Sequence, residues 1–472
     1  MFDKLLRKIK KLIPRHAWNL LWPVYHFLLA YLGNLMYSAP SQRLIVIGVT
    51  GTTGKTTSTY LIAKVLRSAG FKVGFTSTAM FSDGDKDWLN DKKMTMPGRF
   101  FAFKMLKKMV SNGCQFAIVE TTSEGIVQYR HRFINYDTLV FTGLYPEHIE
   151  SHGSFENYKE AKGMLFAHLK DCKTKYADEH RLVKKVETGL KKLSLNRIKK
   201  TIIANADDEH ADYFLNFWSE DKILYYVNSA PAIKYPESSV LTTADINITN
   251  AGTDFVVKHN QVETAINLQI LGGFNIHNAY NAISVGLAHG LSWSQIKVGL
   301  EGVTGIPGRL EKIAAGQDFM VMVDYAFEPN AVEKLYDTVK LIPHQKIIHV
   351  LGSTGGGRDT SRRAILGKIA GSSADIVIVT NEDPYDDDPQ LIIDQVSLGA
   401  EKSGKEEEVN LFKIMDRRAA IAKAFALAGS GDVVLITGKG SEQAICLAKG
   451  VKEPWDDRTV AREELNKLKS KS

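Results

Sequence analysis

A glycine- and threonine-rich stretch at residues 48–57, GVTGTTGKTT, carries the clearest chemical signal in the sequence. Glycines at such a turn let backbone N–H groups point at phosphate oxygens, and Lys55 would place its charge against the β- and γ-phosphates. The hydroxyl of Thr56 suits a Mg²⁺ ligand. The spacing departs from the usual phosphate-loop pattern, because Val49 stands where that pattern has its first glycine. We expect ATP and Mg²⁺ to bind at Thr50, Gly51, Thr52, Thr53, Gly54, Lys55, Thr56 and Thr57.

The elements around this loop must hold it at the edge of a sheet. The run LIVIGVT before it is apolar and β-branched, which is typical of a strand buried on both faces of a parallel sheet. The run STYLIAKVLRSAG after it reads as a helix ending at Gly70. Strand and helix patterns then alternate, which predicts an α/β fold with a doubly wound parallel sheet. Ligands of such sheets gather at the carboxyl ends of the strands. Further expected strands are residues 71–77, 116–120 and 138–142.

The rest of the chain predicts a second α/β unit. Its expected strands are residues 319–323, 346–351, 376–380 and 433–437. Residues 241–271 read as short strands, and residues 173–200 as a charged, helical surface insertion. We therefore expect a basic and apolar N-terminal helical segment at 1–40, a central ATP-binding domain at 41–307, and a C-terminal Rossmann-like α/β domain at 308–472.

Further short motifs follow the loop in an order that resembles the Mur ligase superfamily, which includes the muramyl-peptide ligases and folylpolyglutamate synthetase. Within the superfamily the sequence is most similar to the MurE-type branch, the UDP-N-acetylmuramoyl-tripeptide synthetases. The matching motifs are TGTTGKTT at 50–57, ETTSEG at 120–125, TGLYPEHIESHG at 142–153, YKEAKGMLF at 158–166, NADD at 205–208, GFNIHN at 273–278, GIPGRLE at 305–311, DYA at 324–326, GSTGGGRD at 352–359, DP at 383–384 and GKGSE at 438–442.

The resemblance implies a metal site beside the triphosphate. Glu120, His148 and Lys162 match family residues that hold Mg²⁺ together with the loop threonine, Thr56. The family lysine is carbamylated, so that a cation becomes a carboxylate-like ligand. Taken alone, each residue also has a structural interpretation: an exposed charge at a strand end, a turn cap, or a surface lysine.

Nucleotide and substrate contacts are implied in the same way. An arginine suits an anionic acceptor because its planar guanidinium binds in a bidentate manner. Residues that match family positions for nucleotide contact are Asn278, Arg309 and Asp324. Those that match positions for the muramyl-peptide acceptor are Thr95, Ser123, Gln128 and Arg130. Those assigned to the amino acid are Asp383, Tyr385, Gly440 and Glu442.

Two departures from the family concern the substrates. Members that add diaminopimelate read DNPR where this chain reads EDPY at 382–385, so Tyr385 replaces the arginine for a second carboxylate. Three aspartates follow at 386–388; such an acidic rim suits a cationic amino acid such as lysine, and a solvated loop would show the same composition. Because only residues 1–42 precede the first strand, we also expect no separate uridine-binding domain.

These residues predict an ATP-dependent amide ligase. A carboxylate of a cell-wall, muramyl-peptide-like precursor would attack the γ-phosphate, and the resulting acyl phosphate would react with an amino acid to give an amide, ADP and phosphate. Two alternatives are open. One is a related ligase with a folylpolyglutamate-type or lipid-linked acceptor. The other, less in keeping with the metal residues, is a non-catalytic, nucleotide-dependent protein recruited to a membrane.

The N-terminal segment combines charge with apolar surface. Lys4, Arg7, Lys8, Lys10, Lys11 and Arg15 account for most of the formal charge of +7, and residues 17–37 are apolar and aromatic. Three interpretations are open: a helix docked on the protein, an interfacial helix on an anionic membrane, and a membrane span. The second interpretation implies membrane-surface contact through residues 1–37. The expected partners are otherwise small-molecule substrates, and no nucleic-acid partner is expected.

Overall composition is that of a soluble globular protein, with 44% hydrophobic and 24% charged residues. Cys114, Cys172 and Cys446 lie far apart and form no CxxC pair, which argues against a disulfide framework or a structural zinc site. A cytoplasmic location is therefore expected, with the inner face of the membrane as a peripheral site.

Overall fold

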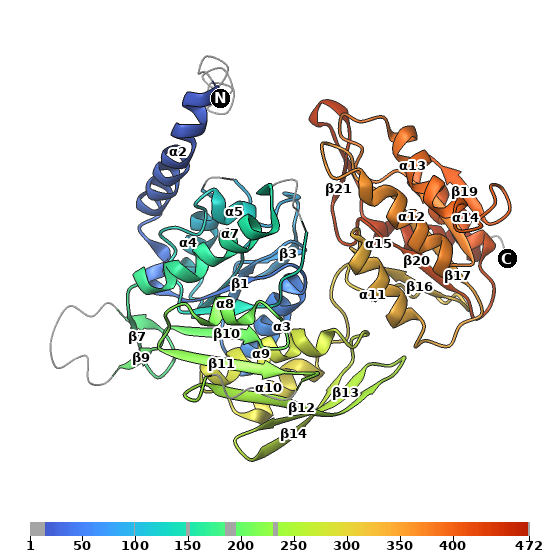
Figure 1. Ribbon diagram of the computed structural model, residues 1–472. Coiled ribbons are helices and arrows are strands. Elements are labelled where there is room, and N and C mark those ends of the chain that lie inside the picture. Colours follow the sequence, from blue (N-terminus) through green and yellow to red (C-terminus); the bar gives the residue numbers. More distant parts are fainter. Residues whose placement is uncertain (1–14, 99, 148–151, 185–194, 230–234, 471–472) are drawn as a thin grey trace. The chain divides into compact units, whose positions relative to one another are not determined.

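The computed structural model describes residues 15–98, 100–147, 152–184, 195–229 and 235–470, with side chains from Leu21 onward. The chain forms two compact units (Figure 1). The first comprises Met1–Asp87, Met94–Thr242 and Tyr280–Ile296, and the second comprises Trp88–Lys93, Thr243–Ala279 and Lys297–Ser472. The domain boundaries expected after residues 40 and 307 stay a prediction.

The first unit is built on a mainly parallel sheet with the strand order β11-β10-β6-β1-β5-β2-β3-β4. Neighbours from β11 to β2 pair in parallel, and β3 is antiparallel to β2. The strands are β1 (Ile45–Thr50), β2 (Val73–Thr76), β3 (Met80–Ser82), β4 (Asp87–Leu89), β5 (Phe116–Glu120), β6 (Thr138–Phe141), β10 (Thr201–Asn205) and β11 (Asp221–Tyr226). The helices are α2 (Arg15–Met36), α3 (Lys55–Ser68), α4 (Phe101–Ser111), α5 (Ser123–Val127), α7 (Phe155–His168) and α8 (Ala211–Leu215), with 3-10 turns η1 (Pro40–Arg43) and η2 (Leu169–Asp171).

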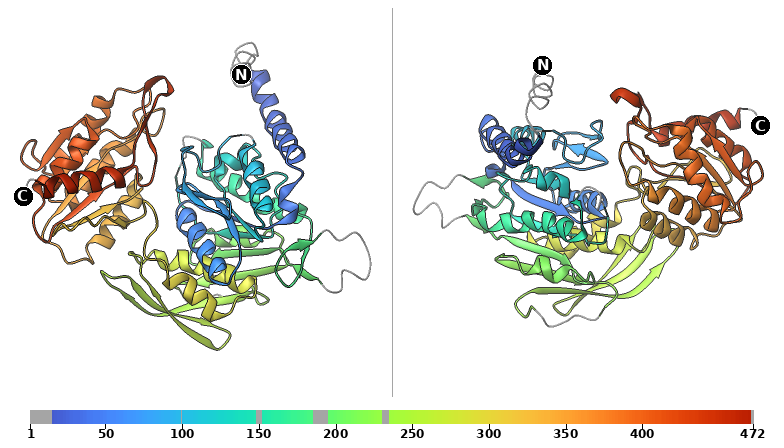
Figure 2. Two further views of the ribbon diagram at one scale, coloured as in Figure 1. Left: turned by 180° about the vertical axis from the view of Figure 1, so that it is seen from behind. Right: turned by 45° about the horizontal axis from the view of Figure 1, so that its top comes forward.

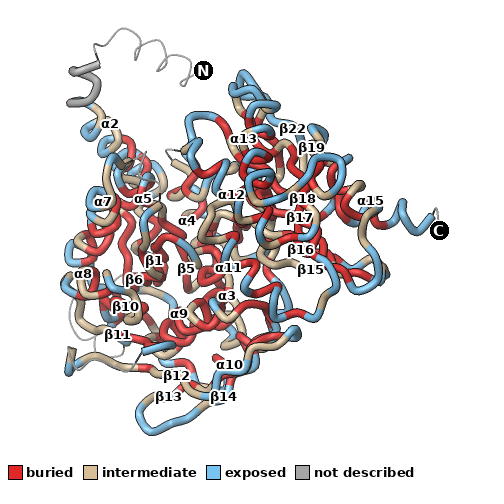
Figure 3. Tube along the Cα trace, turned by 45° about the vertical axis from the view of Figure 1, so that its right-hand side comes forward, coloured by how far each residue is buried: buried red, intermediate tan, exposed pale blue. Residues whose placement is uncertain are grey.

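The central strand β1 positions the glycine-rich loop. Every residue of β1 is buried, as expected for a strand covered on both faces, and β5 and β6 flank it (Figure 3). The register pairs Val49 with Glu120 and Thr50 with Phe141. The loops that follow these three strands therefore leave the same edge of the sheet, where the sequence predicts the ligand site.

The charged insertion at residues 173–200 was expected to be helical, and this expectation is wrong where the structure describes it. A small antiparallel sheet, β8-β7-β9, forms from β7 (Lys175–Ala177), β8 (Val183–Lys184) and β9 (Asn196–Ile198). Two lysines of the expected insertion, Lys175 and Lys200, are buried. Each places Nζ on the buried carboxylate of Asp137, at 2.5 and 2.8 Å. Residues 185–194 lie outside the described residues.

The second unit contains a parallel sheet of order β15-β16-β20-β17-β18-β19, in which β15 alone among these strands is antiparallel to its neighbour. The strands are β15 (Glu311–Lys312), β16 (Met320–Val323), β17 (Ile347–Leu351), β18 (Ile376–Thr380), β19 (Leu411–Ile414) and β20 (Val433–Ile436). The helices are α11 (Pro329–Val339), α12 (Ser361–Ser373), α13 (Pro389–Glu401), α14 (Arg417–Leu427) and α15 (Asp457–Lys469). A hairpin of β21 (Ala444–Cys446) and β22 (Lys452–Pro454) encloses the turn η4 (Ala448–Gly450).

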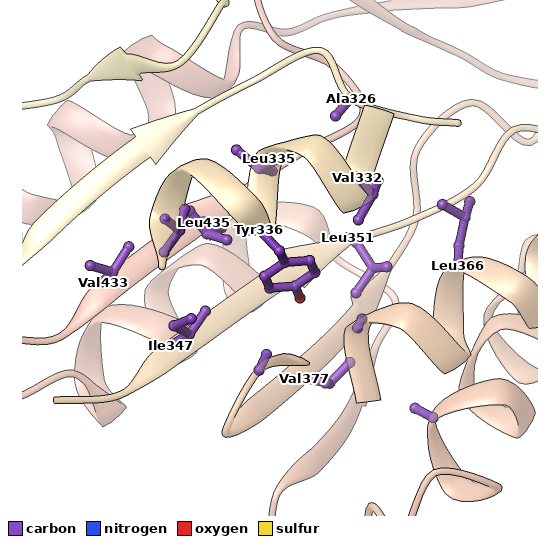
Figure 4. Close-up of a cluster of buried hydrophobic side chains, with 14 of the residues drawn as sticks. Ala326, Val332, Leu335, Tyr336, Ile347, Leu351, Leu366, Val377, Val433 and Leu435 are labelled. Carbon is purple, nitrogen blue, oxygen red and sulfur yellow. The ribbon is translucent and has the colours of Figure 1, made fainter. Parts of the chain in front are cut away.

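Alternate residues of these strands supply two separate cores, because successive side chains of a strand point to opposite faces. Val433 and Leu435 of β20 face α11, α12 and α13 in the cluster of Figure 4. Val434 and Ile436 pack with α14 and α15 on the other face. This confirms the expected α/β architecture with helices on both sides of a parallel sheet.

Five further elements lie between residues 239 and 301 and are divided between the two units. They are β12 (Ser239–Ile248), which begins by pairing in parallel with β11, the antiparallel strands β13 (Thr253–His259) and β14 (Val262–Leu268), and the helices α9 (Asn275–Ala288) and α10 (Trp293–Glu301). The strands confirm the short-strand pattern expected for residues 241–271.

Helix α2 leads away from the body of the first unit in Figures 1 and 2. Its C-terminal half packs on that unit, where Gly33 lies against Phe100 and Phe103, and Phe27 contacts the rings of Tyr129 and Phe133. Among the helices that the structure describes, none combines the length and the apolar character needed to cross a bilayer.

Candidate functional site

The loop between β1 and α3 adopts a tight, glycine-dependent turn. Gly51 and Gly54 have φ angles of 153° and 77°, and a Cβ on Gly51 would lie 2.0 Å from the Thr142 hydroxyl. Lys55 curls back over the loop and donates to the carbonyls of Gly51 and Thr52, at 3.0 and 2.6 Å. Helix α3 starts at Lys55, so its unsatisfied N–H groups and its positive dipole end face the loop. This is the arrangement that binds phosphate.

Glu120 is placed next to the loop by β5 and is 1% exposed. Its two carboxylate oxygens accept from the Thr56 hydroxyl at 3.2 and 3.0 Å. Thr78, just after β2, donates to the same carboxylate through its N–H and its hydroxyl, both at 2.8 Å, and the Thr95 hydroxyl lies 2.7 Å from that of Thr78. A buried carboxylate ringed by hydroxyls is a hard-oxygen set of the kind that Mg²⁺ prefers.

Lys162 lies inside the first unit rather than on its surface. Its side chain is 1% exposed, donates to the Gly51 carbonyl at 2.9 Å, and lies over the ring of Tyr158. Burial lowers the pKa of the Lys162 amine well below its usual range, and the Lys55 ammonium lowers it further. A lowered pKa increases the neutral fraction of the amine, which is the form that reacts with carbon dioxide to give a carbamate.

Residues 142–145, after β6, fasten the other side of the loop. Thr142 donates to the Thr53 carbonyl at 2.6 Å, and the Gly143 carbonyl accepts from the Thr52 N–H at 2.8 Å. Tyr158 donates to the Thr52 hydroxyl at 3.2 Å. His148, the remaining predicted metal ligand, lies outside the described residues, and within the described ranges no cluster of three or more His, Cys, Asp or Glu could hold a metal by itself.

The residues predicted for the acceptor fall into two pairs in the first unit. Ser123 begins α5, where its hydroxyl lies 3.0 Å from Nε2 of His152, and burial and Lys162 both lower the pKa of that histidine. Arg130 donates to the Gln128 amide oxygen at 2.6 Å and to the Met96 carbonyl. Met96 follows Thr95 in the chain, so Arg130 and Gln128 lie next to Thr95. The Thr95 hydroxyl contacts that of Thr78, which donates to Glu120.

In the second unit, Asp324 follows β16 and is held by its own backbone neighbourhood. It accepts from the N–H groups of Leu310 and Ala326, both at 2.7 Å. Burial raises the pKa of Asp324 despite these donors and the nearby Arg309. The Arg309 guanidinium stacks 4.5 Å from the centre of the Tyr325 ring. Asn278 donates to Asn275 at 2.8 Å within α9.

The amino-acid residues of the sequence prediction meet in a cluster of charges at the end of β18. Asp383 accepts from Lys439 at 2.8 Å, from Lys93 at 2.7 and 2.9 Å, and from the Cys446 N–H at 2.6 Å. Glu442 accepts from Lys439 at 2.6 Å and lies 3.1 Å from Lys93. Burial alone would raise the pKa of Asp383, but the two lysines outweigh it and hold the pKa below its usual range.

The neighbouring positions have backbone roles. Gly440 has a φ of 52° and approaches the Gly308 carbonyl so closely that a side chain there would be strained. Tyr385, with a φ of 52°, packs its ring against Gly356. Burial raises the pKa of Glu382 to about 7, and its Oε2 has no hydrogen-bond partner among the described residues.

Several of these residues were not singled out from the sequence. Thr78 is an isolated polar residue without a motif of its own, Lys93 lies in a charged loop, and His152 belongs to the recognised motif at 142–153 but was given no role. Tyr158 and Lys439 belong to motifs that were recognised, but nothing in the spacing shows that one hydroxyl supports the loop or that one ammonium neutralises Asp383. Contacts of this kind join residues far apart in the sequence and need the fold.

A phosphate-binding loop between a buried parallel strand and a helix, with a carboxylate and a buried lysine against it, defines a nucleotide-dependent enzyme of the α/β class. Residues 49–193 match the Mur ligase middle domain, and residues 308–440 match the Mur ligase glutamate ligase domain. The chain belongs to the Mur ligase family, whose members are ATP-dependent ligases that form carbon–nitrogen bonds.

Named relatives are similar over most of their length. The chain is 35% identical over 444 residues to the UDP-N-acetylmuramyl-tripeptide synthetase of Roseiflexus sp. (strain RS-1), covering 93% of this chain and 82% of that protein. It is 33% identical over 437 residues to the UDP-N-acetylmuramoyl-L-alanyl-D-glutamate–2,6-diaminopimelate ligase of Geobacillus kaustophilus (strain HTA426), covering 92% and 81%. These relatives confirm the MurE-type resemblance.

Solved structures agree on the fold. A UDP-N-acetylmuramoyl-L-alanyl-D-glutamate–2,6-diaminopimelate ligase aligns with a TM-score of 0.58 at 26% identity, over 90% of this chain and 79% of that one. The Mycobacterium tuberculosis folylpolyglutamate synthase complexed with ADP aligns with a TM-score of 0.63 over 88% and 92%. At 15% identity the second comparison concerns the fold alone.

Proposed function

We propose that this protein uses ATP to join an amino acid to a carboxylate of a muramyl-peptide-like cell-wall precursor through an acyl phosphate. The observation that carries the proposal is the loop at 50–57, with Glu120 and the buried Lys162 placed against it. Relatives named for the addition of an amino acid to a UDP-muramyl peptide support the acceptor class.

In the proposed reaction the acceptor carboxylate attacks the γ-phosphorus, and ADP leaves. The amine of the amino acid then attacks the acyl carbon, an amide bond forms, and inorganic phosphate leaves. Lys55 and the N-terminus of α3 stabilise the charge that develops on the phosphates. Their positions are set before the substrate arrives, because the loop is fastened by residues 142–145 and by Tyr158.

The metal and substrate residues enter the proposal with the roles that the resemblance implies. Mg²⁺ would be held by Thr56, Glu120, His148 and carbamylated Lys162, and would neutralise phosphate charge when bound. The lowered pKa of the Lys162 amine supports its carbamylation. The nucleotide would contact Asn278, Arg309 and Asp324, the acceptor Thr95, Ser123, Gln128 and Arg130, and the amino acid Asp383, Tyr385, Gly440 and Glu442. The proposed location is the cytoplasm, where ATP is available, and the free Cys114, Cys172 and Cys446 support it because they suit reducing conditions.

The test is ADP release that depends on both an amino acid and an acceptor. Purified protein is incubated with ATP, Mg²⁺, a panel of amino acids and UDP-muramyl dipeptide, and the amide product is identified by mass spectrometry. Lys55→Ala should abolish product formation, whereas Lys64→Ala, further along α3, should leave it unchanged. Product formation that survives Lys55→Ala, or ADP release without any amide, would overturn the proposal.

The panel of acceptors also separates the two alternatives that share the fold. A folate polyglutamate acceptor should give no product if the cell-wall assignment is right. A lipid-linked muramyl peptide is the second candidate acceptor, and the exposed apolar face of α2 favours it over the folate.

A further inference from the structure

Helix α2 exposes an apolar face where a helix on a globular protein ordinarily shows polar residues. Leu21, Val24, Leu28, Tyr31, Leu32 and Leu35 are each between 42% and 55% exposed. Their spacing of three and four residues places them on one side of the helix, within about 120° of arc. We call this set the α2 stripe.

The opposite side of the same helix is the one that packs on the protein. Leu29 and Ala30 are buried, and Gly33 lies against Phe100 and Phe103. The helix is therefore already attached to the first unit, and its own packing does not account for the stripe. Contiguous apolar surface of this kind on a soluble protein marks an interaction site.

The charge around the stripe is of one sign. Between Asp3 and Asp83 the sequence contains no acidic residue, while Lys4, Arg7, Lys8, Lys10, Lys11 and Arg15 precede the stripe. A protein partner would need a matching acidic surface beside an apolar groove. A bilayer with anionic headgroups presents negative charge and apolar depth together, and the helix is amphipathic rather than long and apolar enough to span it.

We propose that the α2 stripe docks on an anionic lipid surface, with the helix lying in the headgroup region. The leucines enter the acyl boundary, and Tyr31, half exposed between them, sits at the headgroup level where aromatic side chains are favoured. This surface is separate from the nucleotide loop, so the docking does not depend on the ligase reaction.

The experiment is sedimentation of the full chain with vesicles of two compositions. One contains equal parts phosphatidylglycerol and phosphatidylcholine, and the other contains phosphatidylcholine alone. The protein should bind the anionic vesicles, and binding should weaken about tenfold when salt is raised from physiological to several times that level. The combined substitutions Leu28→Gln, Leu32→Gln and Leu35→Gln should weaken it by roughly a hundredfold or more.

A matched control removes the same number of equally exposed leucines elsewhere. Leu341→Gln, Leu391→Gln and Leu398→Gln, at 49%, 52% and 45% exposure in the second unit, should bind the anionic vesicles like the unaltered protein. Should the triple α2 variant fold poorly, each single substitution should weaken binding by about tenfold. Amino-acid-dependent ADP release from a water-soluble acceptor should be the same in all variants.

Three outcomes would overturn the proposal. The unaltered protein stays in the supernatant with both vesicles; the triple α2 variant binds as well as the control; or vesicles of phosphatidylcholine alone bind equally well. A concentration-dependent dimer in sedimentation velocity that the α2 substitutions abolish, without vesicle binding, would assign the stripe to a second copy of the chain instead.

Discussion

Replacing Lys162 with methionine should abolish the ligase activity of the protein while leaving the stability of the first unit intact. The side chain is fully enclosed, and its amine makes a hydrogen bond to the Gly51 carbonyl at 2.9 Å. Methionine keeps most of the volume and removes the amine. If Lys162 serves the metal and the phosphates, the substitution should abolish ligation without unfolding the protein.

The expected change in stability follows from two opposing contributions. Loss of the hydrogen bond costs about 0.5–1.5 kcal/mol, and relief from burying an amine returns about 1–3 kcal/mol. The free energy of unfolding should therefore stay unchanged or rise by up to about 2 kcal/mol. Ligation should fall by about a hundredfold or more, the usual effect of removing one electrostatic group from a transition state.

The pH dependence provides an independent check, and its sign follows from proton counts. Because the pKa of Lys162 is lowered in the folded state, the unfolded chain binds more protons at this group between the folded and the unfolded pKa. Stability of the unaltered protein should then rise with pH up to the unfolded value of 10.5, by about 1.4 kcal/mol per pH unit from this group. The methionine variant should lack this rise.

The assay is urea unfolding of the whole protein at several pH values in buffer free of bicarbonate. The rate of amide formation is measured on the same proteins. Lys159→Met, the same change on the outer side of α7, is the control and should alter neither the pH slope nor ligation. A loss of more than about 3 kcal/mol in Lys162→Met with ligation retained would show that the lysine is a structural support, and would refute the reasoning.

Three other substitutions test the remaining groups. Asp137→Asn leaves Lys175 and Lys200 buried with no carboxylate between them, so the urea midpoint should fall by an amount equivalent to about 3–5 kcal/mol; a change below about 1 kcal/mol would contradict this. Thr56→Val removes the hydroxyl that contacts Glu120. The Mg²⁺ concentration for half-maximal ligation should rise about tenfold, with little change in the free energy of unfolding. An unchanged Mg²⁺ dependence would exclude Thr56 from the metal site. Burial lowers the pKa of His349 to about 3, so the unfolded chain takes up a proton that the folded state resists, and stability falls as pH drops below 6.5. In urea unfolding, His349→Gln should remove about 1.4 kcal/mol per pH unit of this acid dependence. An identical pH slope in both proteins would be the contrary result.

The parts of the fold that the sequence predicted are those fixed by local pattern. A continuous apolar run such as residues 44–50 has to be covered on both faces, and this alone indicates β1 and the sheet around it. The loop and its lysine follow immediately in the chain, so their placement at the strand end needs no long-range information.

The errors and omissions arose where distant residues decide the structure. Residues 173–200 are rich in lysine and other helix-forming types, yet Lys175 and Lys200 are drawn inward by Asp137, and tertiary pairing outweighs helix propensity there. Thr78 contacts Glu120 across 42 positions of sequence, and no spacing rule connects the two. The interpretation of Lys162 as a surface lysine fails for the same reason, because only the fold encloses it.

The acidic rim after Tyr385, at Asp386, Asp387 and Asp388, makes local contacts within the second unit. Asp386 accepts from the Lys449 N–H, Asp387 lies 3.3 Å from Arg363, and Asp388 caps α13. All three carboxylates are exposed, and among the described residues only Asp387 of the three is paired with a cation, so the preference for a cationic amino acid stays a prediction.

Asp383 and Glu442 are the carboxylates that the sequence predicts to bind the amino acid. Their two negative charges are balanced by the ammonium groups of Lys93 and Lys439, at distances of 2.6–3.1 Å. A neutral cluster gives no net attraction for a cation, because any new ammonium must displace one that is already buried and hydrogen-bonded. If the amino acid binds at this cluster as the sequence predicts, a lysine-like side chain would have to displace Lys93 or Lys439, whereas a small uncharged amino acid would not.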